Sequence, residues 1–313
     1  MAGWTAAHIP DLTGRTALVT GANSGLGFHT SLQLATHGAR VLLAARDTTR
    51  GERALGKLTA AAPDASVELV RLDLADLDSV REATDEVATR CERLDILVNN
   101  AGIMAPPYRQ TLDGFESQFG TNHLGHFALS GLLLPLLLAA PAARVVTVSS
   151  LAHQGGGIGF DDLQSTRAYD PMRAYAQSKL ANLLFAAELD NRARAAGVDL
   201  TSVAAHPGLA ATKLMQSRPG EAKGRLRGLV FGLGFRVVGQ SEAHGAWPQL
   251  YAATMPDVVG GEYFGPSRLG GTRGAPIRVD RSPAAKDPAS GARLWDISEQ
   301  LTGVTYDLPV STA

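Results

Sequence analysis

Tyr175 and Lys179 are the side chains whose types and spacing most directly suggest chemistry. They stand four residues apart in a helical pattern, so their side chains share one face, one turn apart. A free phenol has a pKa of about 10, and burial raises it, so a nearby cation must outweigh burial before the phenol can act as a base. The pair predicts a tyrosine acid–base assisted by a lysine; the alternative is an ordinary exposed helix face.

Two polar clusters stand where apolar runs end. Ser149 and Ser150 follow one run, and Asn99-Asn100-Ala101-Gly102 closes another. The carboxyl ends of parallel strands meet at one edge of a sheet, where ligand crevices form. A hydroxyl from either serine can donate to a substrate oxygen and stabilise its developing charge. Either serine can equally cap a helix or turn, so both readings stay open.

A glycine-rich turn, Thr20-Gly21-Ala22-Asn23-Ser24-Gly25-Leu26-Gly27, joins the first apolar run to a helical pattern. Gly21 and Gly25 can adopt backbone angles closed to other residues and let a pyrophosphate approach. Gly27 allows the helix to pack close to the sheet, and the helix N-terminus offers free N–H groups to phosphates. The turn therefore indicates a dinucleotide site; the alternative is an ordinary strand–helix connection.

The second apolar run ends in Arg46, followed by Asp47. A carboxylate near this position usually accepts the ribose 2′-hydroxyl of NAD, whereas an arginine can bind the 2′-phosphate of NADP. Arg46 favours NADP(H) over NAD(H), and Asp47 leaves the alternative open.

Short apolar runs alternate with longer amphipathic runs through the first two-thirds of the chain. Most are continuously apolar, which is typical of strands covered on both faces. The alternation predicts an α/β fold: a doubly wound parallel sheet with helices on both faces. The expected strands are Thr16–Thr20, Arg40–Ala45, Ser66–Leu72, Asp95–Asn99, Ala143–Ser149 and Val198–Ala205, and the clearest helical patterns are Leu26–His37, Ser79–Cys91 and Tyr175–Ala195.

We expect one domain, residues 1–313, with its core at 14–265. After residue 205 the alternation stops. Residues 213–240 combine glycines, basic side chains and scattered apolar ones, and long excursions of this kind are often functional. They are expected to form a substrate lid, with a plain surface loop as the alternative. Residues 266–313 are expected to be a C-terminal extension with one helix, Ser290–Leu301.

Composition excludes several classes of protein. The net charge of -1 lacks the excess of Lys and Arg that nucleic-acid binding requires. Cys91 is the only cysteine, so no intrachain disulfide is possible. Met1–Pro10 lacks the features of a secretion signal, and the most apolar stretch, Leu132–Ala143, is too short to cross a bilayer of about 30 Å. We expect a cytoplasmic protein without a transmembrane segment.

The histidines do not indicate a metal site. His123 and His126 are three residues apart, but no cysteine or acidic pair nearby completes a ligand set. Structural roles are expected for both, and for His206. His153, three residues after Ser150, can reach the mouth of a substrate site.

As a set, these motifs resemble the short-chain dehydrogenase/reductase family, whose fold is a Rossmann-type sheet. The match covers about residues 14–265. Within the family, Ala22–Gly25, Asn122–Phe127 and Ser178–Asn182 look like the retinol dehydrogenase and WW-domain oxidoreductase branch. The long gap from Ser150 to Tyr175 departs from the shortest members. The motifs that carry the resemblance are Thr20–Gly27, Asp73-Leu74, Asn99–Gly102, Asn122, Ser150, Tyr175 with Lys179, and Pro207-Gly208 with Thr212.

The resemblance implies roles for individual residues. Tyr175 would exchange a proton with the substrate oxygen, Lys179 would lower the tyrosine pKa and bind the nicotinamide ribose, and Ser150 would orient the substrate. Asn122 would hold a water that connects Lys179 to solvent. The cofactor would contact Gly21, Asn23, Ser24, Gly25, Leu26, Gly27, Arg46, Asp73, Leu74, Asn100, Ala101, Gly102, Tyr175, Lys179, Pro207, Gly208, Leu209 and Thr212.

Two functions are compatible with these residues. The first is an oxidoreductase that transfers hydride between NADP(H) and an apolar alcohol, aldehyde or ketone. The second is an NADP(H)-binding regulator or scaffold with little turnover. The intact set of four catalytic residues favours the enzyme. The resemblance also suggests a homodimer or homotetramer formed through the helices at Asp113–Ala140 and Pro171–Ala195.

Overall fold

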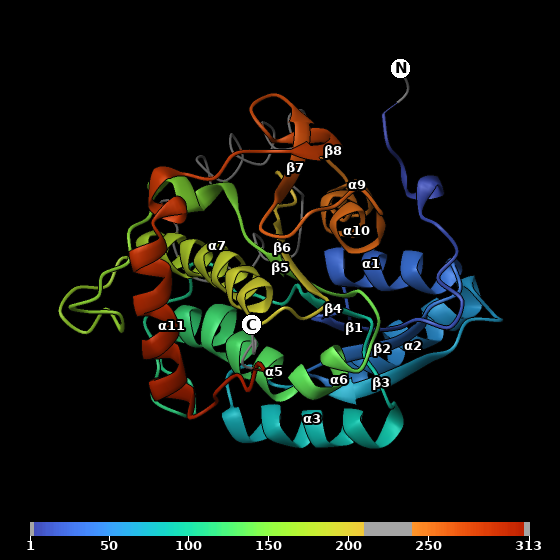
Figure 1. Cartoon of the computed structure of the whole chain (residues 1–313), viewed down its shortest axis with the longest axis horizontal. Helices are drawn as coiled ribbons and strands as arrows, with labels where there is room; N and C mark the ends of the chain where they lie inside the picture. Colours follow the sequence, from blue (N-terminus) through green and yellow to red (C-terminus); the bar gives the residue numbers. More distant parts are fainter. Residues whose placement is uncertain (1–2, 210–239, 310–313) are drawn as a thin grey trace, which may run out of the picture.

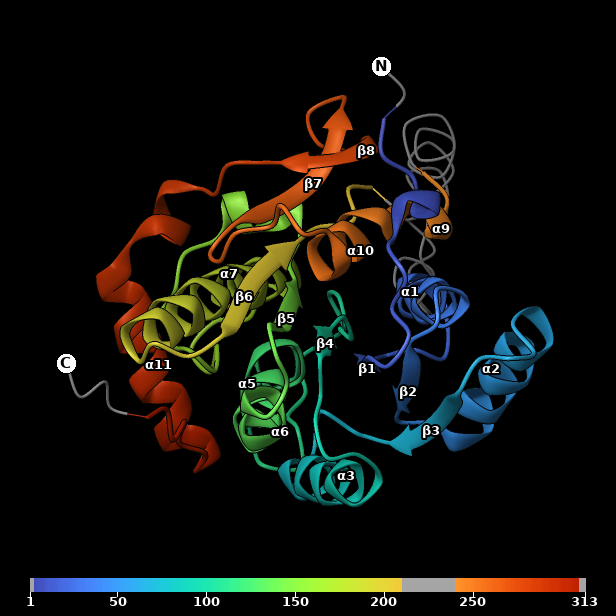
Figure 2. The same cartoon turned by 45° about the vertical axis from the view of Figure 1, so that its right-hand side comes forward.

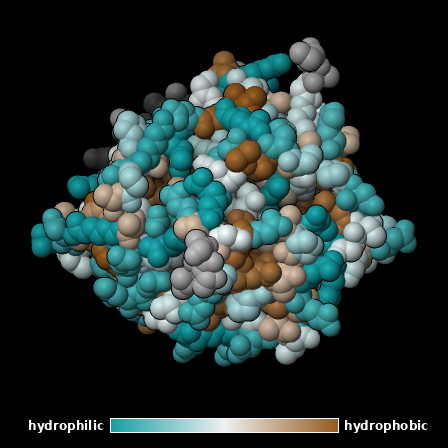
Figure 3. Space-filling model, viewed as in Figure 1, coloured by the Kyte–Doolittle hydropathy of each residue, from teal (hydrophilic) through white to brown (hydrophobic). Residues whose placement is uncertain are grey.

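The computed structural model describes residues 3–209 and 240–309. Figure 1 shows a central sheet flanked by helices, with the C-terminal helix α11 (Pro288–Thr302) running down one side. On the face shown in Figure 3 the surface is mostly hydrophilic, with hydrophobic colour gathered near its centre. Among the described helices, none combines the length and apolar character that crossing a membrane requires.

Within the described residues, one eight-stranded sheet has the order β3-β2-β1-β4-β5-β6-β7-β8. All neighbours are parallel except β7 and β8, which form an antiparallel pair. The chain builds outward from β1 to β3, then returns past β1 to add β4 to β8. The reversal lies between β1 and β4, where ligand crevices form in open sheets. The strands are β1 (Thr16–Thr20), β2 (Arg40–Ala45), β3 (Val67–Arg71), β4 (Ile96–Asn99), β5 (Ala143–Val148), β6 (Leu200–Ala205), β7 (Tyr263–Arg268) and β8 (Arg273–Arg278).

Helices cover both faces of the sheet, as Figure 2 shows. One layer holds α1, α2 and α10, and the other holds α3, α5, α6 and α7. The predicted doubly wound α/β class is confirmed. The helices are α1 (Gly25–Thr36), α2 (Thr48–Ala61), α3 (Leu77–Arg90), α4 (Ser117–Phe119), α5 (Gly125–Leu132), α6 (Leu134–Leu138), α7 (Pro171–Ala195), α9 (Glu242–Gly245) and α10 (Trp247–Thr254), with a π-helical turn at Gly120–Leu124 and a 3-10 turn, η3, at Leu151–Gly155.

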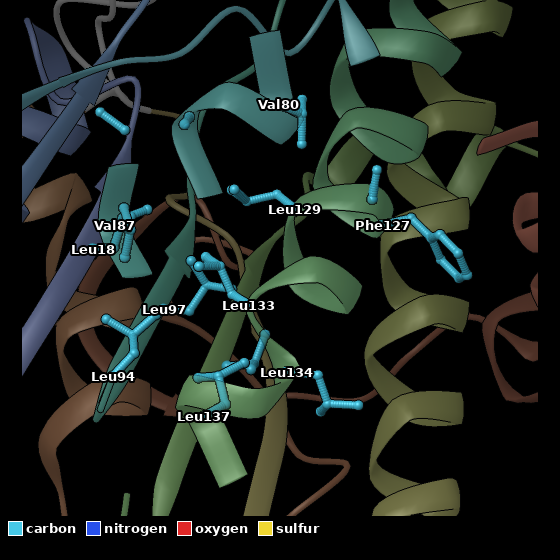
Figure 4. Packing of buried hydrophobic residues seen from close by; sticks show 14 of the residues in the cluster. Leu18, Val80, Val87, Leu94, Leu97, Phe127, Leu129, Leu133, Leu134 and Leu137 are labelled. Carbon is cyan, nitrogen blue, oxygen red and sulfur yellow. The ribbon is translucent and has the colours of Figure 1, made fainter. Parts of the chain in front are cut away.

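Each layer buries its own apolar cluster against the sheet. Figure 4 shows the cluster beneath α3, α5 and α6, where leucines from β1 and β4 meet side chains from the three helices. Burying one such side chain contributes roughly 1.5–3 kcal/mol. The labelled members are Leu18, Val80, Val87, Leu94, Leu97, Phe127, Leu129, Leu133, Leu134 and Leu137.

No strand was expected after Ala205, but the structure has two, β7 and β8. The strands β7 and β8 contain Pro266 and Pro276, which reduce the strand signal. Proline is tolerated in an edge strand such as β8, where a missing N–H costs little, and Pro266 of β7 lies beyond the residues that pair with β6, which end at Phe264. The sheet therefore continues through residue 278. The predicted C-terminal helix is confirmed; Asp287 caps its start, and Gly303 ends it with a φ of 65°.

The C-terminal helix covers part of the α5–α7 surface. The ring of Trp295 is buried and stacks on Phe185 of α7 at 5.9 Å, and it meets Phe127 of α5 edge-on at 5.1 Å. The hydroxyl of Tyr306 donates to the carbonyl of Phe127 at 2.7 Å. Part of the helical surface through which self-association was expected is therefore covered within the chain.

Candidate active site

The glycine turn after β1 is shaped by contacts that only glycine permits. Gly21 and Gly25 have φ angles of 65° and 61°, in the left-handed region. A Cβ on Gly27 would lie 2.5 Å from the carbonyl oxygen of Gly21 and 2.6 Å from the Nδ2 of Asn100. Ser24 makes no side-chain hydrogen bond to the first turn of α1. The start of α1 thus offers unpaired N–H groups beside a tight turn, which fits a pyrophosphate.

Thr20, the last residue of β1, joins this turn to the loop after β4. Its hydroxyl oxygen accepts from the backbone N–H groups of Asn100 and Ala101, both at 2.9 Å. The amide of Asn100 donates in return to the carbonyl of Thr20 at 2.7 Å. Sequence reasoning did not identify this role of Thr20, although its place directly before the glycine turn is a usable signal.

At the end of β2, the neighbouring side chains of Arg46 and Asp47 have different partners. The Asp47 carboxylate caps α2 by accepting from the Arg50 backbone at 3.0 Å, and it pairs with the Arg50 guanidinium at 3.2 Å. The Arg46 side chain is 66% exposed and lies 3.9 Å from the carboxylate of Asp73. Leu74 is buried, and α5 approaches its carbonyl so closely that a Cβ on Gly125 would lie 2.4 Å from it.

Tyr175 and Lys179 lie on α7 with both side chains buried. The Nζ of Lys179 donates to the Val148 carbonyl at 2.9 Å and lies 5.9 Å from the centroid of the Tyr175 ring. Burial lowers the pKa of Lys179 to about 8. Burial raises the pKa of Tyr175, and only a hydrogen bond with Ser150 opposes this. The lysine charge does not outweigh burial here, so the expected lowering of the tyrosine pKa is absent from this arrangement.

The two serines after β5 do different things. The Ser149 hydroxyl is buried and donates to the backbone carbonyl of Lys179 at 2.7 Å. The Oγ of Ser150 accepts from the Ala152 N–H at 3.2 Å, which caps η3, and the Ser150 hydroxyl lies near enough to the Tyr175 phenol to lower its pKa. The structure therefore places the Ser150 hydroxyl beside the tyrosine and gives Ser149 a supporting role.

Asn122 ties the loop after β4 to α7. Its side chain exchanges two hydrogen bonds with the backbone of Ile103, at 2.8 and 3.0 Å, and donates to the Ser178 hydroxyl at 2.9 Å. Ser178 in turn donates to the Tyr175 carbonyl at 2.8 Å. Gly102 lets this packing occur, because a Cβ there would lie 3.2 Å from the Asn122 Oδ1 and 3.4 Å from the Lys179 Nζ.

Beyond β6, Gly208 has a φ of 67°, and a Cβ on it would lie 2.3 Å from the Thr272 carbonyl. Leu209 donates its N–H to the same carbonyl at 2.9 Å, which packs the Pro207–Leu209 turn against the β7–β8 hairpin. Thr212 and the expected lid at 213–239 lie outside the described residues.

His153 is buried next to Ser150. Its Nδ1 lies 2.6 Å from the Ser150 carbonyl, and its ring packs edge-on against Tyr263 at 5.6 Å. His206 packs against the same tyrosine at 5.2 Å, and its Nδ1 accepts from the Gly208 N–H at 3.2 Å. Both histidines therefore support the walls of the site.

The parallel sheet, the glycine turn and the tyrosine–lysine pair at one sheet edge define a dinucleotide-dependent dehydrogenase. The family model described as short chain dehydrogenase matches residues 15–222. The chain belongs to the short-chain dehydrogenase/reductase family, and within it to the retinol dehydrogenase-like branch.

Curated relatives resemble the whole chain. Retinol dehydrogenase 14 of Mus musculus is 39% identical over 310 residues, which cover 93% of this chain and 86% of that protein. Retinol dehydrogenase 13 of Homo sapiens is 40% identical over 296 residues, covering 94% and 86%. These relationships make the protein an NAD(P)-dependent oxidoreductase that acts on CH–OH groups.

Solved structures share the fold. A crystal structure of an uncharacterized protein from Mycobacterium paratuberculosis is 45% identical, covers 98% of this chain and 100% of its own, and has a TM-score of 0.81. The RhlG/NADP active-site complex of Pseudomonas aeruginosa is 23% identical, covers 81% and 94%, and has a TM-score of 0.63. The second similarity concerns the fold alone.

Proposed function

We propose that this protein transfers hydride between NADP(H) and an apolar alcohol, aldehyde or ketone, with Tyr175 as the general acid–base. One observation carries the proposal: the phenol of Tyr175, the hydroxyl of Ser150 and the amine of Lys179 meet at the sheet edge that also holds the glycine turn. Relatives named retinol dehydrogenases support an apolar alcohol or its carbonyl form as the substrate.

The residues divide the work in this proposal. The turn from Gly21 to Gly27 and the start of α1 bind the pyrophosphate, Asp73 and Leu74 border the adenine, and the Asn100–Gly102 loop lines the cleft. The bound nicotinamide supplies or accepts the hydride. Pro207, Gly208, Leu209 and Thr212 seat the nicotinamide ring.

At the substrate, Ser150 donates to the carbonyl oxygen and stabilises its growing negative charge. Tyr175 then donates its phenolic proton to that oxygen as the hydride reaches carbon. Lys179 favours this transfer because its positive charge stabilises the phenolate that remains. Asn122 holds the backbone around these groups through Ile103 and Ser178.

The tyrosine pKa favours the reductive direction. Burial raises the pKa of Tyr175, so the phenol stays protonated through neutral pH and is ready to act as an acid. Oxidation requires the phenolate, which this arrangement disfavours. We therefore propose carbonyl reduction with NADPH as the faster direction near neutral pH.

The proposed preference for NADP(H) rests on Arg46. Its guanidinium is largely exposed at the end of β2, while the neighbouring Asp47 carboxylate is engaged in capping α2. Replacing Arg46→Asp removes the 2′-phosphate partner and adds a repelling charge. We expect NADPH affinity to fall roughly tenfold or more, with little change for NADH, measured by fluorescence titration. An equal loss for both cofactors contradicts the preference.

The activity is tested by following NADPH absorbance against retinoids, steroids, aromatic aldehydes and quinones. Tyr175→Phe should lower kcat by about 10²–10⁴-fold and leave NADPH binding unchanged, because it removes only the transferable proton. Tyr169→Phe is the matched control, since the Tyr169 hydroxyl donates to the Pro106 carbonyl at 2.8 Å and lies outside the proposed chemistry. Equal activity of the Tyr175 variant and the wild type rejects the proposed acid.

Two expectations remain predictions. Self-association as a homodimer or homotetramer is measured by light scattering, and the cytoplasmic location is measured by fractionation of the source cells.

A further inference from the structure

His126 lies at the start of α5, between the nucleotide turn and the catalytic residues, and only 1% of it is exposed. Its Nε2 is 2.9 Å from the hydroxyl of Thr20. Its Nδ1 is 2.9 Å from the backbone carbonyl of Asn122. The imidazole thus bridges two residues that belong to different parts of the site.

The partners fix which nitrogen carries the proton. Both acceptor positions of the Thr20 hydroxyl are filled by the N–H groups of Asn100 and Ala101, so its own proton must be donated. The Nε2 of His126 at 2.9 Å is a nearer acceptor for it than the Val98 carbonyl at 3.4 Å. Nε2 must then be the acceptor. The carbonyl of Asn122 can only accept, so Nδ1 must carry the ring proton. A single neutral tautomer satisfies every group.

Burial, helped by the positive charge of Lys179 and opposed by the hydrogen bond to the Asn122 carbonyl, lowers the pKa of His126 to about 4. The ring is therefore neutral at neutral pH. A second ring proton would point an N–H at a hydroxyl whose acceptor positions are already filled. The bridge depends on the neutral form.

Each end of the bridge holds a different function. Thr20 fixes the loop after β4 to the end of β1, beside the glycine turn. Asn122 leads through Ser178 to the backbone of Tyr175. Thr20 and Asn122 are 102 residues apart in the sequence, and His126 contacts both of them.

We propose that His126 is a positioning residue that couples the nucleotide-binding turn to the catalytic tyrosine. This inference rests on the proposed function of the site. Without the imidazole, the Asn122 carbonyl loses this partner in the interior, and the Thr20 proton is left with only the Val98 carbonyl at 3.4 Å. Buried polar groups that lose good partners shift or admit water. Cofactor binding and proton transfer should then both suffer.

His123 provides a matched control. It is three residues earlier and equally buried, but its Nε2 lies 2.9 Å from the Ser298 hydroxyl of α11. His126→Leu and His123→Leu each remove one buried imidazole. Both should lower Tm by a similar amount. Only His126→Leu should also weaken NADPH binding and lower kcat, each by roughly tenfold relative to the control.

A double-mutant cycle with Thr20→Val tests the coupling itself. In the His126→Leu background the Thr20 hydroxyl has already lost this partner. Adding Thr20→Val should therefore lower NADPH affinity by less than Thr20→Val does in the wild type. Thr20→Ser keeps the hydroxyl and should retain most NADPH affinity. In the wild type, nitrogen NMR of labelled histidine should show His126 protonated at Nδ1 and not at Nε2.

Three results each overturn the inference: His126→Leu behaving like His123→Leu in both NADPH affinity and kcat, additive losses in the cycle, or a proton on Nε2. Failure of the proposed function has a different signature. In that case the wild type turns over no substrate, while the NADPH titrations and the tautomer still decide whether His126 couples the two parts.

Discussion

The two halves of the candidate site are built differently. The nucleotide half, from β1 to β4, depends on backbone: glycines with left-handed angles, open N–H groups and a hydroxyl that holds two amides. The catalytic half, around α7, depends on buried polar side chains held by other buried side chains. The nucleotide half depends on glycines that lack a Cβ, whereas the catalytic half depends on particular polar side chains.

The difference predicts how each half responds to change. A backbone site tolerates loss of side chains but not added bulk, because a new Cβ displaces the chain. A side-chain site is sensitive to small backbone shifts, because its groups must keep their hydrogen-bond distances and charge states. It is less sensitive to substitutions at its rim. Substitutions can separate these two behaviours.

The largest effect is expected in the nucleotide half for Gly27→Ala. The added Cβ meets the Gly21 carbonyl and the Asn100 amide at distances no Cβ tolerates, so the turn must move. NADPH binding should weaken at least tenfold, and stability should fall by roughly 1–3 kcal/mol. Gly56→Ala in α2 is the control, because nothing lies within 4 Å of its new Cβ. Its stability should rise by about 0.5–1 kcal/mol. Unchanged NADPH affinity in the Gly27→Ala variant would contradict the claim that the nucleotide half cannot accept an added Cβ.

A pH profile probes the catalytic half. Lys179 carries its charge below its pKa of about 8 and loses it as the pH rises through that value. Because the neutral amine no longer stabilises the phenolate, kcat for reduction should fall about tenfold per pH unit above it. Lys179→Arg keeps its charge at higher pH, so any activity that it retains should not show this decline. A flat wild-type profile through the alkaline range argues against the lysine role.

The smallest effect is expected at Glu242, on the rim of the nucleotide half. Its Oε1 lies 3.6 Å from where a Cβ of Gly25 would stand, next to the turn proposed to bind the pyrophosphate. Removing this like charge by Glu242→Gln should strengthen NADPH binding about two- to fivefold. Glu82→Gln on α3 changes the net charge equally at a site that is 73% exposed, and should leave binding unchanged. Equal effects of the two substitutions point to net charge alone.

The nucleotide half was largely predictable from the sequence, because its requirements are local. Glycine spacing after an apolar run already contains the turn, and the six expected strands match the observed β1 to β6 within two residues at each end. Helix α7 begins at Pro171, as in the range considered for self-association and four residues before the Tyr175–Ala195 pattern, because proline is tolerated in the first turn of a helix.

The catalytic half was predictable only as a set of residue types. Its hydrogen bonds join residues far apart in sequence, such as Asn122 to Ser178 and Ser149 to Lys179. No local pattern distinguishes Ser149 from Ser150, or reveals that Thr20 and His126 share a hydrogen bond. The direction of the Tyr175 pKa also depended on burial, which spacing does not report.

One junction bears on how such a protein acquires new substrates. The N–H of Gln240 donates to the Leu209 carbonyl at 3.0 Å, and the Gln240 side chain bonds both the Pro207 carbonyl and the Gly274 N–H. These hydrogen bonds hold Leu209 and Gln240 together, although thirty sequence positions separate them. Because the free energy of closing a chain between fixed ends changes only slowly with length, we expect a change in the number of residues between these ends to leave the sheet undisturbed.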